Sequence, residues 1–527
     1  MDVFARLARL FVLPGEPVCA DRLRWYELRL TWLALAMLSV LPFLCTPLPP
    51  LGDLYSHIGR YHVMLTHGVS PYLDRYYQFH WALIPNMGQD LLMVPVGRLL
   101  GAERGGILLS ALILPATILG IRAVSIAAHG RVQPIALLAA PFAASYTYLF
   151  GFMNYHTGLV VVVWGLAACY GLRRHPLAAR CAAFMVLSVL AWLCHLAAWG
   201  LLVVAVAVTE LGFRLSERGS RPLAVLPQAG LVVLSALVPV ALMLGGGAHS
   251  GAAHFGRFNL GLKWQWLTMV LRDEWRPLDT FPLPAIVLGV IVLLAWRKVR
   301  LDPVLTAFAA VTFGLFLVVP SALMGGYYAD LRLLPVAWIA ALLACRFEGP
   351  PRLATAIGVA AIVFFALRMS FTAHAWSVRG DSLARDLRAL DYVPPGARIF
   401  ALTPDRNCNS WPNQGLSHLP SLAIVRRDAF VNTEWNIPGQ HLMRPIKIAG
   451  PDFNVWPDLA NPGSGCYGRT ADAALTGFPR DRFDFVWLFA AQLSPDTHNW
   501  LAPLYRGPHG VLYAVRHEPK AATTGQK

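Results

Sequence analysis

Apolar segments of near-spanning length recur along the first two thirds of this chain and then stop. A helix needs about 20 predominantly apolar residues to cross a bilayer, and such runs follow one another from Leu30 to about Thr372. Only 14% of the residues are charged, whereas charged residues make up about a quarter of a typical soluble domain. The sequence therefore predicts a polytopic α-helical membrane protein.

We predict about eleven spans on this criterion. They cover residues 30–47, 105–128, 133–150, 157–172, 181–194, 196–213, 223–244, 281–296, 303–323, 332–345 and 353–372. The stretch from Cys181 to Phe213 is divided in two, because one helix of that length would measure about 50 Å against a hydrocarbon core of about 30 Å.

Basic residues indicate the orientation. Arg6, Arg9, Arg22, Arg24 and Arg29 precede the first predicted span, so the positive-inside rule places the N-terminus in the cytoplasm. With an odd number of spans, the C-terminal region then lies in the periplasm of a bacterial inner membrane. The net charge of +15 is scattered over short loops and forms no basic patch with interleaved aromatics, which argues against nucleic acid as a partner.

The end of the apolar runs divides the chain into two predicted domains. Residues 1–373 form the transmembrane domain, with a first periplasmic loop at 48–104, and residues 374–527 form a small periplasmic α/β accessory domain. Three predicted strands and a terminal hairpin support this domain. They are RIFALTP (398–404), LAIVRR (422–427), FDFVWLFA (483–490) and the hairpin at 504–516. Cys408 and Cys466 lie in this domain, and an oxidising compartment would let them pair.

The first loop opens with three polar side chains on one predicted helical face. Asp53, His57 and Arg60 recur at i, i+4 and i+7, which is typical of an amphipathic helix at a membrane surface. Two interpretations of Asp53 stay open: it caps this helix or it takes part in chemistry. Asn86 and Asp90 stand at the start of a second amphipathic helix, where capping is again the alternative to binding.

Further polar groups are predicted at the same membrane face. Asn154 and His156 lie between two spans, His195 lies at the turn of the divided stretch, and Tyr328 and Arg332 lie at the mouth of a later span. Hydrogen bonds between packed helices are the alternative explanation for the histidines. For Arg332 the alternatives are a side chain that reaches the interface or pairs with a carboxylate, and a side chain that binds an anion.

This arrangement resembles the GT-C class of integral membrane glycosyltransferases, which includes protein O-mannosyltransferases and lipid A aminoarabinose transferases. The resemblance is carried by one N-terminal span, a long outer loop of two amphipathic helices with the early Asp53, many further spans and a C-terminal soluble domain. It implies transfer of a sugar from a polyprenyl-phosphate carrier to a lipid, glycan or protein acceptor at the outer membrane face, with inversion at the anomeric carbon.

The resemblance also implies roles for these residues. Asp53, tuned by His57, is the candidate base for the acceptor hydroxyl. Arg332, with Arg60 as second choice, is the candidate for the departing phosphate, because a guanidinium binds phosphate oxygens in a fork. The remaining candidates for substrate binding are Asn86, Asp90, Asn154, His156, His195 and Tyr328.

No cofactor is predicted. The chain has neither an HExxH nor a CxxC motif, and its histidines lack the spacing of zinc ligands. A divalent ion at Asp53 finds no support in the sequence.

Two rival functions remain. A lipid or polysaccharide transporter or flippase would also need many spans, but no predicted span carries an Asp or Glu in its interior for ion coupling, and no inverted repeat is evident. A scaffold for envelope assembly would leave the polar outer loop unexplained.

Overall fold

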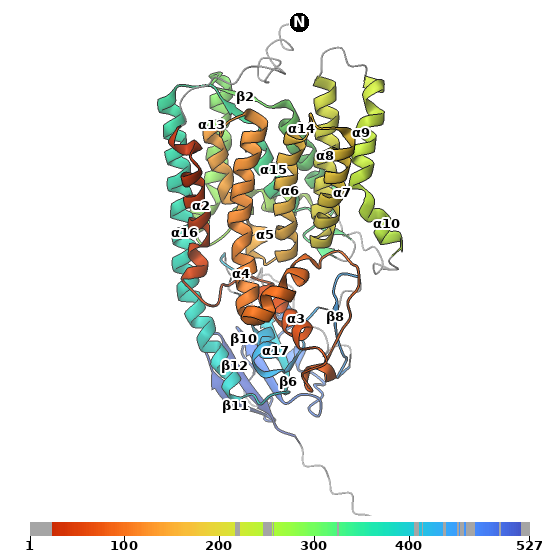
Figure 1. Cartoon of the computed structure of the whole chain (residues 1–527). Coiled ribbons are helices and arrows are strands. Elements are labelled where there is room, and N and C mark those ends of the chain that lie inside the picture. The colour runs from red at the N-terminus through yellow and green to blue at the C-terminus, as the bar shows by residue number, and fades with distance from the viewer. Residues whose placement is uncertain are drawn as a thin grey trace, which may run out of the picture.

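The computed structural model combines a helical bundle with a small sheet domain at one end of it (Figure 1). It describes residues 24–216, 222–245, 256, 258–323, 326–404, 411–413, 415–435, 439–450, 453, 458–459, 469–494 and 497–517. The bundle contains α2 (Arg29–Leu44), α4 (Gly88–His129), α5 (Tyr146–Leu149), α6 (Met153–Gly171), α7 (Leu177–Cys194), α8 (Leu196–Ser216), α9 (Pro222–Ala236), α10 (Val238–Gly245), α13 (Pro282–Ala295), α14 (Pro303–Val318), α15 (Leu333–Leu343) and α16 (Pro351–Leu387). The 3-10 segment η3 (Pro134–Ala144) precedes α5, and the short helices α11 (Leu260–Met269) and α12 (Arg276–Thr280) precede α13.

The helices match the predicted apolar segments, and the chain is a multi-pass membrane protein. Each of the predicted segments is largely helical within the described residues. Five described helices are long and apolar enough to cross a membrane by themselves, or six if the bent pair of α9 and α10 forms one span. The number of spans therefore stays a prediction.

The predicted division of Cys181–Phe213 is confirmed. Helix α7 ends at Cys194 and α8 begins at Leu196, with His195 between them in an extended conformation (φ −169°, ψ 137°). The chain thus reverses direction at a polar residue, as the length argument requires.

The first loop contains the two expected helices. The first is α3 (Leu54–Thr66), and the second is the N-terminal part of α4, which is kinked at Gly101. Gly101 has φ 78° and ψ 165°, a conformation that is nearly restricted to glycine. This kink lets one continuous segment form first a loop helix and then a span.

The C-terminal domain is built on a sheet of mixed direction. Its strand order is β11-β12-β10-β6-β7, with β9 paired to β6. Strands β6 (Arg398–Pro404), β7 (Phe430–Val431) and β10 (Phe485–Phe489) run parallel, while β11 (Leu501–Arg506) and β12 (Gly510–Val515) form the predicted hairpin. Further elements of this domain are η4 (Arg388–Tyr392), η5 (Leu419–Ser421), β9 (Asp458–Leu459) and α18 (Ala471–Ala474). Helix α16 runs without a break from the bundle to Leu387 and so crosses the expected boundary at residue 373.

The prediction that residues 422–427 form a strand is wrong. They form the helix α17 (Leu422–Arg427), whose buried Leu422, Ala423 and Ile424 pack toward α3. A short apolar run does not distinguish a strand from a buried helical turn, and Arg426 and Arg427 suit a helix C-terminus.

The first loop joins the bundle to the sheet domain. Strand β1 (Tyr77–Phe79) pairs antiparallel with β8 (Met443–Pro445), and α3 lies against α17 (Figure 1). The small pair of β2 (Val299–Leu301) and β5 (Cys345–Phe347) lies at the opposite end of the bundle from the C-terminal sheet (Figure 1). Cys408 and Cys466 lie outside the described residues, so their pairing stays a prediction.

Candidate active site

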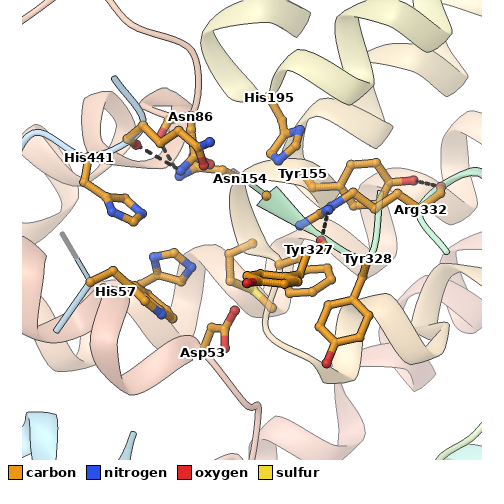
Figure 2. A pocket seen from close by; sticks show the side chains of 15 residues that line it. Asp53, His57, Asn86, Asn154, Tyr155, His195, Tyr327, Tyr328, Arg332 and His441 are labelled. Atoms are coloured by element: carbon orange, nitrogen blue, oxygen red, sulfur yellow. Dashed lines mark hydrogen bonds between the residues drawn. The ribbon is translucent and has the colours of Figure 1, made fainter. Parts of the chain in front are cut away.

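A polar cavity of about 160 Å³ lies where five distant parts of the chain meet. They are the first loop, the start of α6, the turn between α7 and α8, the connection between α14 and α15, and the C-terminal domain. The cavity is lined by Asp53, His57, Asn86, Phe152, Met153, Asn154, Tyr155, His195, Gly326, Tyr327, Tyr328, Arg332, Trp435, Gln440 and His441. Figure 2 shows the Asp53 carboxylate pointing into it, with His57 and His441 on one side and Arg332 on the other.

Asp53 occupies the N-cap position of α3, but its side chain makes no capping hydrogen bond. The capping interpretation therefore does not account for this carboxylate. The backbone holds it in place instead, because Asp53 N donates to the Phe150 carbonyl oxygen at 2.8 Å. Gly151 permits this approach: its φ is +86°, and a Cβ there would lie 2.4 Å from Asp53 N.

Three histidines and a tryptophan surround the carboxylate. His418 is fully buried, and its Nε2 lies 3.8 Å from Asp53 Oδ1. The ring centroid of Trp435 lies 4.5 Å from that of His418, 5.5 Å from that of His57 and 5.6 Å from that of His441. The C-terminal domain thus supplies part of the cavity wall, which the sequence did not predict.

The imidazoles of His57 and His441 are neutral at physiological pH. Burial holds the pKa of His57 well below its usual value, and the nearby Arg60 charge lowers it further. Burial, again with Arg60, lowers the pKa of His441 to about 3. Neutral rings can donate or accept hydrogen bonds at the cavity but supply no fixed positive charge.

Arg332 provides a fixed positive charge on the far side. Its guanidinium lies over the Phe152 ring at 4.3 Å, and Nη1 donates to the Tyr327 carbonyl oxygen at 2.6 Å. Its buried Nε has no hydrogen-bond partner among the described residues. A buried donor in this state is suited to an anionic ligand.

His195 lies at the same wall with a defined proton position. Ala197 N donates to its Nδ1 at 3.0 Å, so the neutral ring carries its proton on Nε2. His195 thus lines the cavity and also accepts a local hydrogen bond within the turn between α7 and α8.

Asn86 and Asn154 connect the parts of the cavity wall. Asn154 Oδ1 accepts from Gln89 N at 2.7 Å, and its Nδ2 donates to the Asn86 carbonyl oxygen at 2.8 Å. Asn86 Nδ2 in turn donates to the Gln440 carbonyl oxygen at 3.2 Å. This chain of bonds links α6, the start of α4 and the C-terminal domain.

Three predicted site residues do not line the cavity. Arg60 donates through Nε and Nη2 to the two carboxylate oxygens of Asp90, each at 2.9 Å, and both side chains are buried. His156 Nε2 lies 2.9 Å from Thr147 Oγ1 inside the bundle. The fork of Arg60 is therefore occupied by a carboxylate, and Arg332 is the better placed of the two arginines for a phosphate.

A second, mainly apolar cavity of about 490 Å³ adjoins the first. Its walls come chiefly from α8 and from the facing ends of α7, α10, α14 and α15. The two cavities share Asn86, His195, Gly326, Arg332 and Gln440. An apolar groove thus leads directly to the Arg332 guanidinium and the His195 ring.

Some of the residues missed by sequence reasoning come from the start of α6, such as Phe152 and Tyr155, and others come from the C-terminal domain. His418, Trp435, Gln440 and His441 belong to no motif and are nearly 400 positions from Asp53 in sequence. The pairing of β1 with β8 and the packing of α3 on α17 help to bring them to the first loop. Within the described part of the chain, no group of three His, Cys, Asp or Glu side chains could hold a metal ion.

Two solved structures have the same overall architecture as this chain. No protein-family model matches the chain, and no curated protein does. Among solved structures, ArnT from Cupriavidus metallidurans bound to undecaprenyl phosphate superposes with a TM-score of 0.51 over 93% of this chain and 98% of that chain, at 14% identity. The chain has the GT-C fold. The apo form of ArnT matches with a TM-score of 0.50 over 92% and 97% of the two chains, at 15% identity.

Proposed function

We propose that this GT-C protein is a membrane glycosyltransferase that takes a sugar from a polyprenyl-phosphate carrier and passes it to an envelope acceptor at the periplasmic face. The observation that carries the proposal is the continuity of the apolar groove with the polar cavity at Arg332 and His195. The apolar groove, the Arg332 guanidinium and the polar cavity follow one another in space. A polyprenyl-phosphate sugar has a hydrocarbon tail, a phosphate and a sugar in the matching order. ArnT, which has the same fold, was solved with undecaprenyl phosphate bound.

The carrier would bind with its first isoprene units in the groove. Its phosphate would then lie at the shared wall, where Arg332 Nε and His195 Nε2 offer N–H groups. Charge-assisted bonds from a guanidinium to phosphate oxygens are among the strong hydrogen bonds in proteins. The sugar would extend into the polar cavity toward Asp53.

Asp53 would serve as the base. The acceptor hydroxyl gives its proton to the Asp53 carboxylate, and its oxygen attacks the anomeric carbon. The bond from that carbon to the phosphate oxygen breaks, and polyprenyl phosphate leaves with the electron pair. Attack opposite the leaving group inverts the anomeric configuration, and Arg332 stabilises the charge that develops on the phosphate.

Turnover of a radiolabelled polyprenyl-phosphate sugar in proteoliposomes tests the proposal. Bacterial envelope lipids and glycans would serve as the acceptor pool, and D53N as the matched inactive control. Label should move to an acceptor with the parent protein and not with D53N. NMR of the product would reveal whether the configuration has inverted.

The same assay separates the rival functions. A transporter or flippase would move the intact carrier across the bilayer without breaking the glycosidic bond, and a scaffold would leave it unchanged. Intact carrier after incubation with every available acceptor class would overturn the proposal.

A further inference from the structure

Helix α11 carries a buried lysine outside the cavity. The helix begins at Asn259, whose side-chain oxygen accepts a hydrogen bond from Leu262 N, and its outward-facing Leu260 and Trp264 are exposed. Its two buried side chains are Lys263 and Trp266. Lys263 is only 2% exposed, and lysine is rarely buried unless it is paired.

The Lys263 ammonium bridges the ends of two helices. It donates to the carbonyl oxygens of Phe316 and Val319, each at 2.7 Å, and to Asp330 Oδ2 at 3.0 Å. Phe316 lies in the last turn of α14 and Val319 is its C-cap, so the cation lies at the negative end of the helix dipole. Asp330 is fully buried just before α15.

The bonds of Lys263 join the two ends of the connection between α14 and α15, and this connection brings Arg332 to the cavity. Asp330 Oδ2 also accepts from Ser321 Oγ at 2.8 Å, and Ala329 N donates to the Ser321 carbonyl oxygen at 2.9 Å. Only one residue separates Asp330 from Arg332, so the bonds that hold Asp330 also restrain the backbone next to Arg332.

The second buried side chain of α11 contacts the same segment. The Trp266 ring packs edge-on against the ring of Tyr328, with centroids 5.7 Å apart, and Tyr328 lines the cavity. Helix α11 thus contacts the α14–α15 connection at two points. Lys263 pairs with Asp330, and Trp266 packs against Tyr328.

We propose that Lys263 is a positioning residue that sets the Arg332 guanidinium for the carrier phosphate. This inference rests on the proposed function, because it takes phosphate binding by Arg332 as given. A binding site needs its groups held to within about 0.5 Å. Without Lys263 the bonds that join α11 to the end of α14 and to Asp330 are lost, so the segment that carries Arg332 is no longer held in place.

Equilibrium binding of undecaprenyl phosphate to the purified full chain in detergent tests this without any turnover. K263M should bind about 10-fold more weakly, a loss of about 1.4 kcal/mol, whereas K263R, which keeps a cation and its donors, should stay close to the parent. K447M is the matched control, because it makes the same substitution at the exposed Lys447 in the C-terminal domain.

A double variant separates positioning from folding. K263M/D330N leaves no unpaired buried charge, so its unfolding temperature should recover toward that of the parent while its affinity stays low. Parent-like affinity in K263M or in the double variant would overturn the inference. Failure of both to fold would overturn it as well, since the pair would then hold the whole bundle rather than one segment.

R332Q distinguishes this outcome from failure of the proposed function. If R332Q binds undecaprenyl phosphate as tightly as the parent, the assignment of the phosphate to Arg332 is wrong. If R332Q loses binding while K263M keeps it, only the positioning role of Lys263 is wrong.

Discussion

At the scale of single residues, the proposed function depends most on Asp53. It stands at the start of a helix and makes no capping bond, so its carboxylate is directed to the cavity rather than to its own backbone. The imidazoles of His57 and His441 are neutral, and Arg60 is paired with Asp90. Among the described residues that line the cavity, Asp53 is the one that carries a carboxylate.

This placement leads to a prediction about D53N and D53A. Because no side-chain cap is lost, both variants should unfold within about 1 kcal/mol of the parent, while sugar transfer should fall by about 100-fold or more with the loss of a general base. Unfolding temperature and transfer rate should be measured on the same preparations. An active D53N would remove Asp53 from the chemistry.

Glu434 leads to a prediction about pH. Its Oε2 accepts from Ser56 Oγ at 2.9 Å, and burial raises its pKa from 4.5 to about 7. Between these values the folded state binds more protons than the unfolded state, so the contribution of Glu434 to stability declines as the pH rises.

E434Q tests the sign of this effect. The unfolding temperatures of the parent and E434Q should be similar near pH 5, and the parent should fall below E434Q by pH 8. A difference that does not change over this range would contradict the raised pKa.

At the scale of elements, hydropathy predicted the helices well and the cavity only in part. The length of the apolar run located the turn at His195, because that length can be read from the local sequence. It failed for α17, whose six residues are too few for a period. The sequence did not show which candidate site residues face the cavity and which, like Arg60, Asp90 and His156, do not. Whether a side chain faces the cavity depends on packing between distant elements.

Helix α8 leads to a prediction about the apolar groove. Gly200 lines the groove, and a Cβ added there would meet no atom within 4 Å. G200L should therefore fold at least as well as the parent, since replacing glycine within a helix gains up to about 1 kcal/mol, yet it should raise the KM for the polyprenyl donor several-fold by filling the groove.

The matched control is G230L. Gly230 lies within α9, also has no atom within 4 Å of an added Cβ, and is not part of either cavity lining. Its donor KM should equal that of the parent. Equal effects of the two variants would mean that the groove does not hold the carrier.

At the scale of the whole molecule, the sheet domain and the β2–β5 pair mark opposite ends of the bundle. The basic residues before the first span and around β2 predict that the sheet domain is the periplasmic end. A reporter fused after Thr372 should therefore behave as periplasmic, and one fused after Arg218 as cytoplasmic. The same compartment for both reporters would contradict the predicted orientation, and cysteine accessibility in intact cells gives an independent readout.

The cavity wall runs from Asp53 to His441 and so includes residues from both ends of the chain. During synthesis the membrane helices are inserted in order, and the last wall residues leave the ribosome only when more than four fifths of the chain has been made. A nascent chain that has not yet reached His441 therefore lacks part of the cavity wall. The order of the sequence itself leaves the candidate site incomplete until most of the chain has been made.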